Sequence, residues 1–199
     1  MMQRHKTTAV RKDQIVNAAK RLIIKHGSEN LTVRAIANEV RLSEGALYRH
    51  FKSKRDILAL LVDTIEADLL GDIKTNNIAG DSYSNILDTI LRGHISAIKQ
   101  RQGISFQVIA EIIGLGDKKL NKRVSEIIAK YIDELKNLLR KGVESGELRK
   151  NLNLDGTALL LFGMIQGLIN IWTLSNYETN LEESYEASWE TLKESIKRI

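Results

Sequence analysis

Apolar residues recur at intervals of three and four along most of this chain, a spacing that places them on one face of an α-helix. The first such run covers residues 10–26 and is followed by Gly27, a residue type that commonly ends helices. Further apolar stripes predict helices over residues 57–69, 83–98, 104–113, 120–138 and 181–199. The pattern therefore predicts a chain that is helical almost throughout.

Two much shorter helices are predicted near the N-terminus. Thr32 stands where an N-cap belongs, before a helix of barely two turns, and Ser43 stands in the same place before a helix that ends near Phe51. A break at residues 41–43 separates the two helices. Because two short helices joined by a tight turn form a helix-turn-helix, we expect this motif at about residues 32–51.

A long apolar stretch lies near the C-terminus. Residues 156–177 carry no charged side chain and are long enough to cross a bilayer. Gln166 and Asn170 argue against a membrane span, and Gly163 and Gly167 are spaced so that another helix can approach closely. We therefore interpret this stretch as a buried helix at the centre of a subunit interface.

The composition agrees with an all-helical protein of the cell interior. The chain has no proline, and aromatic residues make up only 5% of it, which disfavours a β-sandwich. The absence of cysteine leaves no disulfide framework, thiol nucleophile or zinc-thiolate site, so a reducing compartment is the easiest fit. We expect a cytoplasmic protein without a signal peptide, because no short apolar run with a cleavage site opens the chain.

Positive charge is concentrated in the first third of the chain. Residues 1–60 hold 13 Lys and Arg against 5 Asp and Glu, a difference of +8, whereas the other 139 residues hold 17 against 20, a difference of −3. A basic segment of this kind favours a polyanionic partner, for which DNA phosphates are the commonest case. An anionic membrane surface is the alternative partner.

No arrangement of residues indicates catalysis. The four histidines, at positions 5, 26, 50 and 94, have no metal-ligand spacing, and no glycine-rich loop joins a strand to a helix. We therefore expect neither an enzyme nor a bound cofactor or metal.

Two segments of the N-terminal third have distinctive sequences, and they are Leu31-Thr32-Val33-Arg34-Ala35-Ile36-Ala37 and Gly45-Ala46-Leu47-Tyr48-Arg49-His50-Phe51-Lys52-Ser53-Lys54. These two segments resemble the DNA-binding domain of TetR-type (AcrR-type) transcriptional regulators. The resemblance covers roughly residues 9–65, and the rest of the chain matches only in its helix count and in its apolar penultimate and amphipathic final helices.

The resemblance implies an all-α homodimer of about nine helices per protomer. Residues 1–56 would form a three-helix DNA-binding domain with a helix-turn-helix, and residues 57–199 a larger domain for effector binding and dimerisation. The implied function is a ligand-responsive regulator, most simply a repressor, that binds a palindromic operator and is released by a small-molecule effector. The alternative is a structural or division-coordinating DNA-binding protein whose C-terminal domain contacts a protein partner.

The expected DNA contacts follow from helix-turn-helix geometry and from the resemblance. Helix N-termini and hydroxyls would contact phosphates, and small residues would let the second helix press into the major groove. The resemblance assigns phosphate contacts to Tyr48, His50 and Lys54. The full set of expected DNA-binding residues is Thr32, Arg34, Ser43, Gly45, Ala46, Tyr48, Arg49, His50 and Lys54. Capping or helix packing alone also explains several of these residue types.

The effector and interface residues are less sharply defined by the sequence. Amphipathic or polar groups on apolar helices suit a mostly apolar pocket, and they are His94, Phe106, Tyr131, Gln166, Asn170 and Trp172. Because these helices carry no charge cluster, we expect a neutral or amphipathic ligand; Glu111 either faces water or counters a cationic ligand. The expected interface residues are Gly163, Gly167, Tyr185, Trp189 and Leu192.

Overall fold

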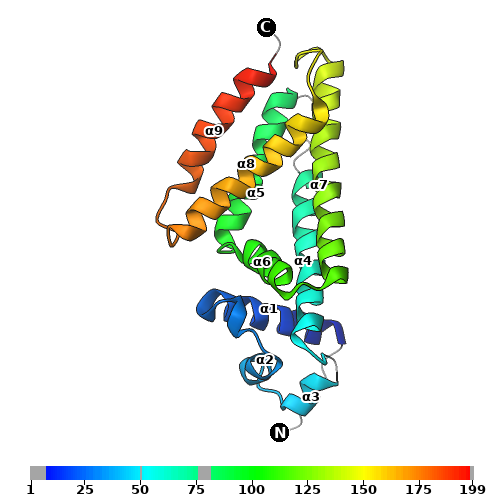
Figure 1. The fold of residues 1–199 in the computed structure, drawn as a ribbon, viewed down its shortest axis with the longest axis vertical. Helices are drawn as coiled ribbons and strands as arrows, with labels where there is room; N and C mark the ends of the chain where they lie inside the picture. Colours follow the sequence, from blue (N-terminus) through cyan, green and yellow to red (C-terminus); the bar gives the residue numbers. More distant parts are fainter. Residues whose placement is uncertain (1–7, 50, 76–81, 198–199) are drawn as a thin grey trace. The chain divides into compact units, whose positions relative to one another are not determined.

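The protein is all-helical throughout the part described by the computed structural model, residues 8–49, 51–75 and 82–197 (Figure 1). These residues form nine α-helices and one short 3-10 turn, with no strand. The α-helices are α1 (Thr8–His26), α2 (Val33–Glu39), α3 (Glu44–Tyr48), α4 (Lys54–Thr75), α5 (Tyr83–Gln100), α6 (Ile104–Leu115), α7 (Lys118–Glu144), α8 (Leu154–Leu174) and α9 (Leu181–Ile196). The all-α prediction is confirmed.

The helices form two compact units, and each unit is built from two separate segments of the chain. The first unit contains the residues up to Ile65 together with Ile104–Lys122, and the second contains Glu66–Gly103 together with the residues from Arg123 onward. The sequence placed a domain boundary after residue 56. The first unit differs from that division because it also contains α6, which packs against α1 and against the 3-10 turn Ser28–Asn30.

A continuous apolar core holds the first unit together. Ile15, Ile23, Leu47 and Ile112 are each no more than 1% exposed. Burying aliphatic side chains of this size contributes roughly 1.5 to 3 kcal/mol each. The core residues come from α1, α2, α3, α4 and α6, and they include Ile15, Ala18, Ala19, Ile23, Ile36, Ala37, Leu47, Ile57, Leu61, Val108 and Ile112.

The two short helices begin where the sequence places their caps. The hydroxyl of Thr32 accepts a hydrogen bond from the backbone N–H of Ala35 at 3.0 Å, and the hydroxyl of Ser43 accepts one from Ala46 at 3.2 Å. Such caps stabilise a helix by about 1 kcal/mol each, which matters for helices of 7 and 5 residues. The turn between them includes Arg41 in the left-handed region, with φ 55°.

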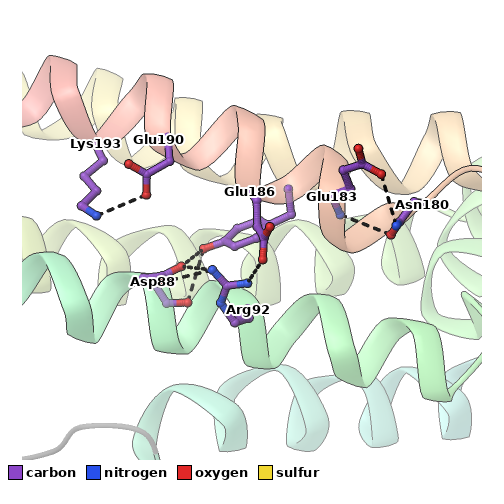
Figure 2. Close-up of polar contacts among 8 residues, drawn as sticks. Asp88, Arg92, Asn180, Glu183, Glu186, Glu190 and Lys193 are labelled. Atoms are coloured by element: carbon purple, nitrogen blue, oxygen red, sulfur yellow. Dashed lines mark hydrogen bonds and ion pairs between the residues drawn. The ribbon is translucent and has the colours of Figure 1, made fainter.

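The second unit packs α9 against α5 and α8. Arg92 of α5 lies between Asp88 on its own helix and Glu186 on α9, to which its Nη1 donates at 2.8 Å (Figure 2). The Tyr185 hydroxyl donates to the Asp88 carboxylate at 2.7 Å. Lys99 and Glu182 form a further α5–α9 ion pair at 2.6 Å. These contacts fix one face of α9 to its own protomer.

The last helix ends earlier than its apolar stripe predicts. α9 ends at Ile196, whose carbonyl accepts a hydrogen bond from the backbone N–H of Arg149 at 3.1 Å. Leu148 and Lys197 form an isolated antiparallel bridge beside this bond. The tertiary pairing with residues 148–149 takes the place of a further helical turn. Residues 198–199, which the sequence prediction included, lie outside the described residues.

Candidate nucleic-acid interface

The residues predicted to read DNA lie on the solvent side of the helix-turn-helix. Leu47 is fully buried and anchors α3, while Gly45, Tyr48 and Arg49 are exposed and Ala46 is half-buried. A Cβ built on Gly45 would meet no atom within 4 Å. Glycine at this position is therefore not required by packing inside the protomer. His50 lies outside the described residues.

The two capping hydroxyls keep a hydrogen-bond donor available. Thr32 and Ser43 are exposed, and each uses its side-chain oxygen as an acceptor for a backbone N–H. A hydroxyl that accepts in this way can still donate its own hydrogen. The same two residues can therefore cap a helix and contact a phosphate, so capping and DNA contact are compatible roles.

Arg34 connects the two short helices on their exposed side. Its Nε lies 3.3 Å from the carboxylate of Glu44, and its side chain is 77% exposed. Exposed ion pairs of this kind are worth little in stability and are easily exchanged. The side chain therefore remains accessible to DNA.

Lys54 is more firmly engaged than the other expected phosphate contacts. Its Nζ lies 2.7 Å from Oε1 of Glu111, in α6, and 3.4 Å from the carbonyl oxygen of Glu29. The other oxygen of Glu111 accepts a hydrogen bond from the Ser28 hydroxyl at 3.0 Å. The bond from Lys54 holds the pKa of Glu111 below its usual value, against the opposing effect of burial and with help from Ser28.

A second ion pair, at the start of α4, was not predicted from the sequence. Arg55 donates to the Asp117 carboxylate, and Asp117 also accepts from the backbone N–H groups of Lys119 and Leu120 at 3.0 and 2.9 Å. The bond from Arg55 is the main cause of a lowered pKa of Asp117, followed by the bond from Leu120. Asp117 directly precedes α7, so an aspartate at a helix start was the available signal.

Two residues predicted for the effector region meet in the core of the second unit. Nδ1 of His94 and the hydroxyl of Tyr131 are 2.8 Å apart, and both side chains are buried. The Tyr131 ring packs edge-on against Phe162, with centroids 6.2 Å apart. Burial lowers the pKa of His94 to about 4, with a smaller contribution from Arg101. The imidazole is therefore neutral at physiological pH.

Trp172 belongs to a different cluster of the second unit. Its ring packs edge-on against Tyr177, with centroids 4.7 Å apart. Both lie against Gly103, which has φ 67° and whose added Cβ would lie 3.7 Å from the Trp172 ring. The glycine suits this turn because a left-handed backbone disfavours other residues.

The other three residues predicted for the effector region lie on two different helices. Phe106 is half-buried in α6, within the first unit, and Gln166 is half-buried in α8. Asn170 is exposed, on the same face of α8 as Gly163 and Gly167. Asn170 therefore does not face the core of its own protomer, because the helix turns its side chain outward. Its place in an effector pocket stays a prediction.

The outward face of α8 is apolar. Leu160 and Leu174 are 63% and 82% exposed, and a Cβ added at Gly163 or Gly167 would meet nothing within 4 Å. The apolar residues on this face are Leu159, Leu160, Ile171 and Leu174. Apolar residues gathered on one exposed helix face are typical of a protein interface.

Two of the predicted interface residues point the other way. Tyr185 and Trp189 are 0% and 1% exposed, and the Tyr185 hydroxyl donates a hydrogen bond to the carboxylate of Asp88 in α5. They offer no surface to a second chain, which corrects the prediction for these two residues. Leu192 is half-buried.

α8 is also the one helix among the described residues that is long and apolar enough to span a membrane by length and composition. Buried helices of water-soluble proteins meet the same criteria, and α8 packs against α9. Among the described residues, no group of three or more His, Cys, Asp or Glu side chains is placed to hold a metal ion.

Comparison with known proteins agrees with this arrangement. Residues 15–61 match the profile of bacterial regulatory proteins of the tetR family, and residues 56–195 match the C-terminal region of YsiA-like proteins. The fatty acid metabolism regulator protein of Bacillus subtilis (strain 168) is 24% identical over 84% of this chain and 86% of its own length. The nucleoid occlusion factor SlmA of Marinomonas sp. (strain MWYL1) is 25% identical over 94% of both chains.

A solved structure has the same fold. The transcriptional regulator FadR from Bacillus subtilis, crystallised with stearoyl-CoA, matches with a TM-score of 0.74 at 23% identity, over 90% of this chain and 96% of its own. The two family matches together span residues 15–195, and the first of them includes the helix-turn-helix. The chain therefore belongs to the TetR family of bacterial regulatory proteins and is a transcriptional regulator, not an enzyme.

Proposed function

We propose that this regulator is a cytoplasmic repressor that binds a palindromic operator as a homodimer and is released by an amphipathic small molecule. The observation that carries the DNA-binding part is the solvent side of α3. There Gly45, Tyr48 and Arg49 are exposed on a helix anchored by Leu47 and capped by Ser43. A second helix of this kind is the element that enters the major groove in helix-turn-helix proteins.

Each expected contact has a distinct chemical role in this proposal. The hydroxyls of Thr32 and Ser43, the phenol of Tyr48 and the ammonium of Lys54 contact phosphates and set the register. Gly45 and Ala46 allow close approach to base edges. Arg34 and Arg49 reach bases or phosphates, and His50 remains an expected phosphate contact by resemblance.

The outward face of α8 supports the homodimer. Gly163 and Gly167 lie on the same helix face as exposed leucines, so the same helix of a second copy can pack closely there. A two-fold dimer presents two recognition helices to one side of DNA, and this requires half-sites about 34 to 36 Å apart. The operator is then a palindrome.

The effector we propose is a long-chain acyl thioester or a molecule of similar amphipathic chemistry. The related Bacillus subtilis structure contains stearoyl-CoA. The second unit of this chain supplies buried aromatic groups with a few polar atoms, notably the His94–Tyr131 pair and Trp172. A mostly apolar lining with few orienting groups suits a ligand of this kind.

The test is selection of bound duplexes from a random DNA pool at near-physiological salt, with and without stearoyl-CoA. We expect enrichment of a short palindrome, and loss of that enrichment when stearoyl-CoA is added. Free coenzyme A and stearate are the controls for the two parts of the ligand. A pool with no enriched sequence would overturn operator binding.

A palindrome that is retained with stearoyl-CoA, coenzyme A and stearate would argue for another effector or for the second candidate. That candidate is a DNA-binding protein that acts through a protein partner. It is favoured by the match to a nucleoid occlusion factor over almost the whole chain. The match of residues 56–195 to the YsiA-like C-terminal region leads us to prefer the effector-responsive repressor.

A further inference from the structure

Among the described residues, Lys54 is the one expected phosphate contact that forms an ion pair with a partly buried carboxylate. The Lys54 and Glu111 side chains are only 25% and 21% exposed, and their charged atoms are 2.7 Å apart. The Arg34–Glu44 pair is longer, at 3.3 Å, and its side chains are 77% and 47% exposed. Solvent therefore screens the Lys54 pair less than the Arg34 pair.

Glu111 is held in place from two sides. One carboxylate oxygen faces Lys54, and the other accepts a hydrogen bond from the Ser28 hydroxyl at 3.0 Å. Ser28 belongs to the 3-10 turn after α1, and α6 packs against both α1 and that turn. The carboxylate is consequently a fixed anion next to the lysine, and it comes from a helix outside the helix-turn-helix.

We propose that Glu111 occupies the position on Lys54 that a DNA phosphate would take, so that it competes with DNA for this lysine. This inference rests on the proposed function, because it assumes that Lys54 contacts a phosphate. The ammonium meets Glu111 and the Glu29 carbonyl in the free protein. Engagement of a phosphate therefore breaks the Lys54–Glu111 pair or brings two anions close together, and either outcome costs binding free energy.

The consequence is that a residue of α6 limits the DNA affinity of the helix-turn-helix. A lysine that contacts a phosphate increases DNA affinity by releasing counterions from DNA, and this gain in affinity does not depend on base sequence. Glu111 should reduce that contribution for every duplex equally. Its effect should be largest at low salt, where the ion pair it forms with Lys54 is strongest.

The experiment measures equilibrium binding of the full-length protein to a short duplex of arbitrary sequence, as a function of salt. Glu111→Gln removes the charge and keeps a group that can accept from Ser28. We expect it to bind about three- to fivefold more tightly at low salt, with a steeper salt dependence than the original protein.

Two further variants decide how such a gain arises. In a Lys54→Gln background, Glu111→Gln should give no gain, because the lysine that it releases is gone. Glu39→Gln is the matched control, since it removes one carboxylate charge from the same unit and breaks the 2.8 Å pair with Arg21. We expect this control to give a clearly smaller gain than Glu111→Gln.

Three results would overturn the proposal while the original protein still binds DNA. They are weaker binding by Glu111→Gln, an undiminished gain in the Lys54→Gln background, and an equal gain from Glu39→Gln. Failure of the original protein to bind any duplex would overturn the proposed function and this inference together. Thermal unfolding of each variant checks its fold, and Glu111→Ala repeats the test if the glutamine variant is unstable.

Discussion

Gly45 is a position at which helix stability and DNA binding favour different residues. It lies within α3, where a Cβ would meet nothing within 4 Å and where glycine weakens a helix relative to alanine. The protein therefore gives up some helix stability at this position for no packing benefit inside the protomer. Close approach to DNA is the explanation that we favour.

Gly45→Ala should accordingly have opposite effects on folding and binding. We expect the free energy of unfolding to stay constant or to rise by up to about 1 kcal/mol, because alanine is the better helix former. Affinity for the selected operator should fall at least tenfold, because the added methyl group holds α3 away from the groove. Chemical denaturation and a binding titration measure the two quantities, and unchanged affinity would remove Gly45 from the interface.

Tyr185 gives a similar test of the corrected role of α9. Its hydroxyl donates to Asp88 at 2.7 Å, and its side chain is fully buried. Tyr185→Phe should lower the free energy of unfolding by roughly 1 to 2 kcal/mol, because the Asp88 carboxylate loses a donor. Sedimentation should show the same assembly state as the original protein. A change in assembly without a loss of stability would restore Tyr185 to the interface.

At the scale of helices, the outward face of α8 should control assembly. Gly167→Leu adds a bulky side chain where the protomer itself has open space. The protomer should therefore fold normally, while two copies can no longer approach closely at this face. We expect sedimentation velocity to show a shift toward monomer, accompanied by weaker operator binding.

Gly114→Leu is the control for this prediction. Gly114 also lies in a helix, α6, and an added Cβ there meets nothing within 4 Å. This variant should keep the assembly state of the original protein. An intact dimer of Gly167→Leu, or dissociation of both variants, would count against the α8 interface.

Helix positions could largely be predicted from sequence, because their signals are local. Thr32 and Ser43 cap α2 and α3 as expected, since the choice of an N-cap depends only on the next three residues. Periodicity also identified the apolar face of α9, and the run without charged residues identified α8. It does not say what covers a face, and this is why Tyr185 was assigned to a partner chain although α5 of the same protomer covers it.

Contacts between segments distant in sequence could not be predicted. The pairing of Lys54 with Glu111 joins residues 57 positions apart and depends on α6 packing with the first unit. Charge and spacing within one helix contain no information about such a partner. The resemblance therefore predicted a phosphate contact for Lys54, whereas the sequence offered only solvent or a cationic ligand as the neighbour of Glu111.

At the scale of the whole molecule, His94 makes stability depend on pH. Its pKa is lowered to about 4 in the folded protein, mainly by burial, against an ordinary value of 6.5. The unfolded chain therefore takes up a proton at this residue before the folded protein does. The resulting stability is fully present above pH 6.5 and is lost as the pH falls toward 4.

Chemical denaturation between about pH 7 and pH 5 should measure this loss, at up to roughly 1.4 kcal/mol per pH unit. His94→Gln keeps a polar partner for Tyr131 but does not titrate. It should flatten the pH dependence in this range, whatever its own stability at pH 7. An equal slope in both proteins would show that His94 is not the responsible group.

The assembly of the first unit from two chain segments has a consequence for inheritance. Ile104–Lys122 joins the residues up to Ile65, and it supplies the partners of Ser28, Lys54 and Arg55. A genetic crossover anywhere between these segments would pair the helix-turn-helix with a foreign segment in place of residues 104–122, and nothing would then keep carboxylates at positions 111 and 117. A hybrid regulator should therefore keep the contacts of the first unit only if both segments come from the same parent. Glu111 and Asp117 should then come from the same parent as the N-terminal third.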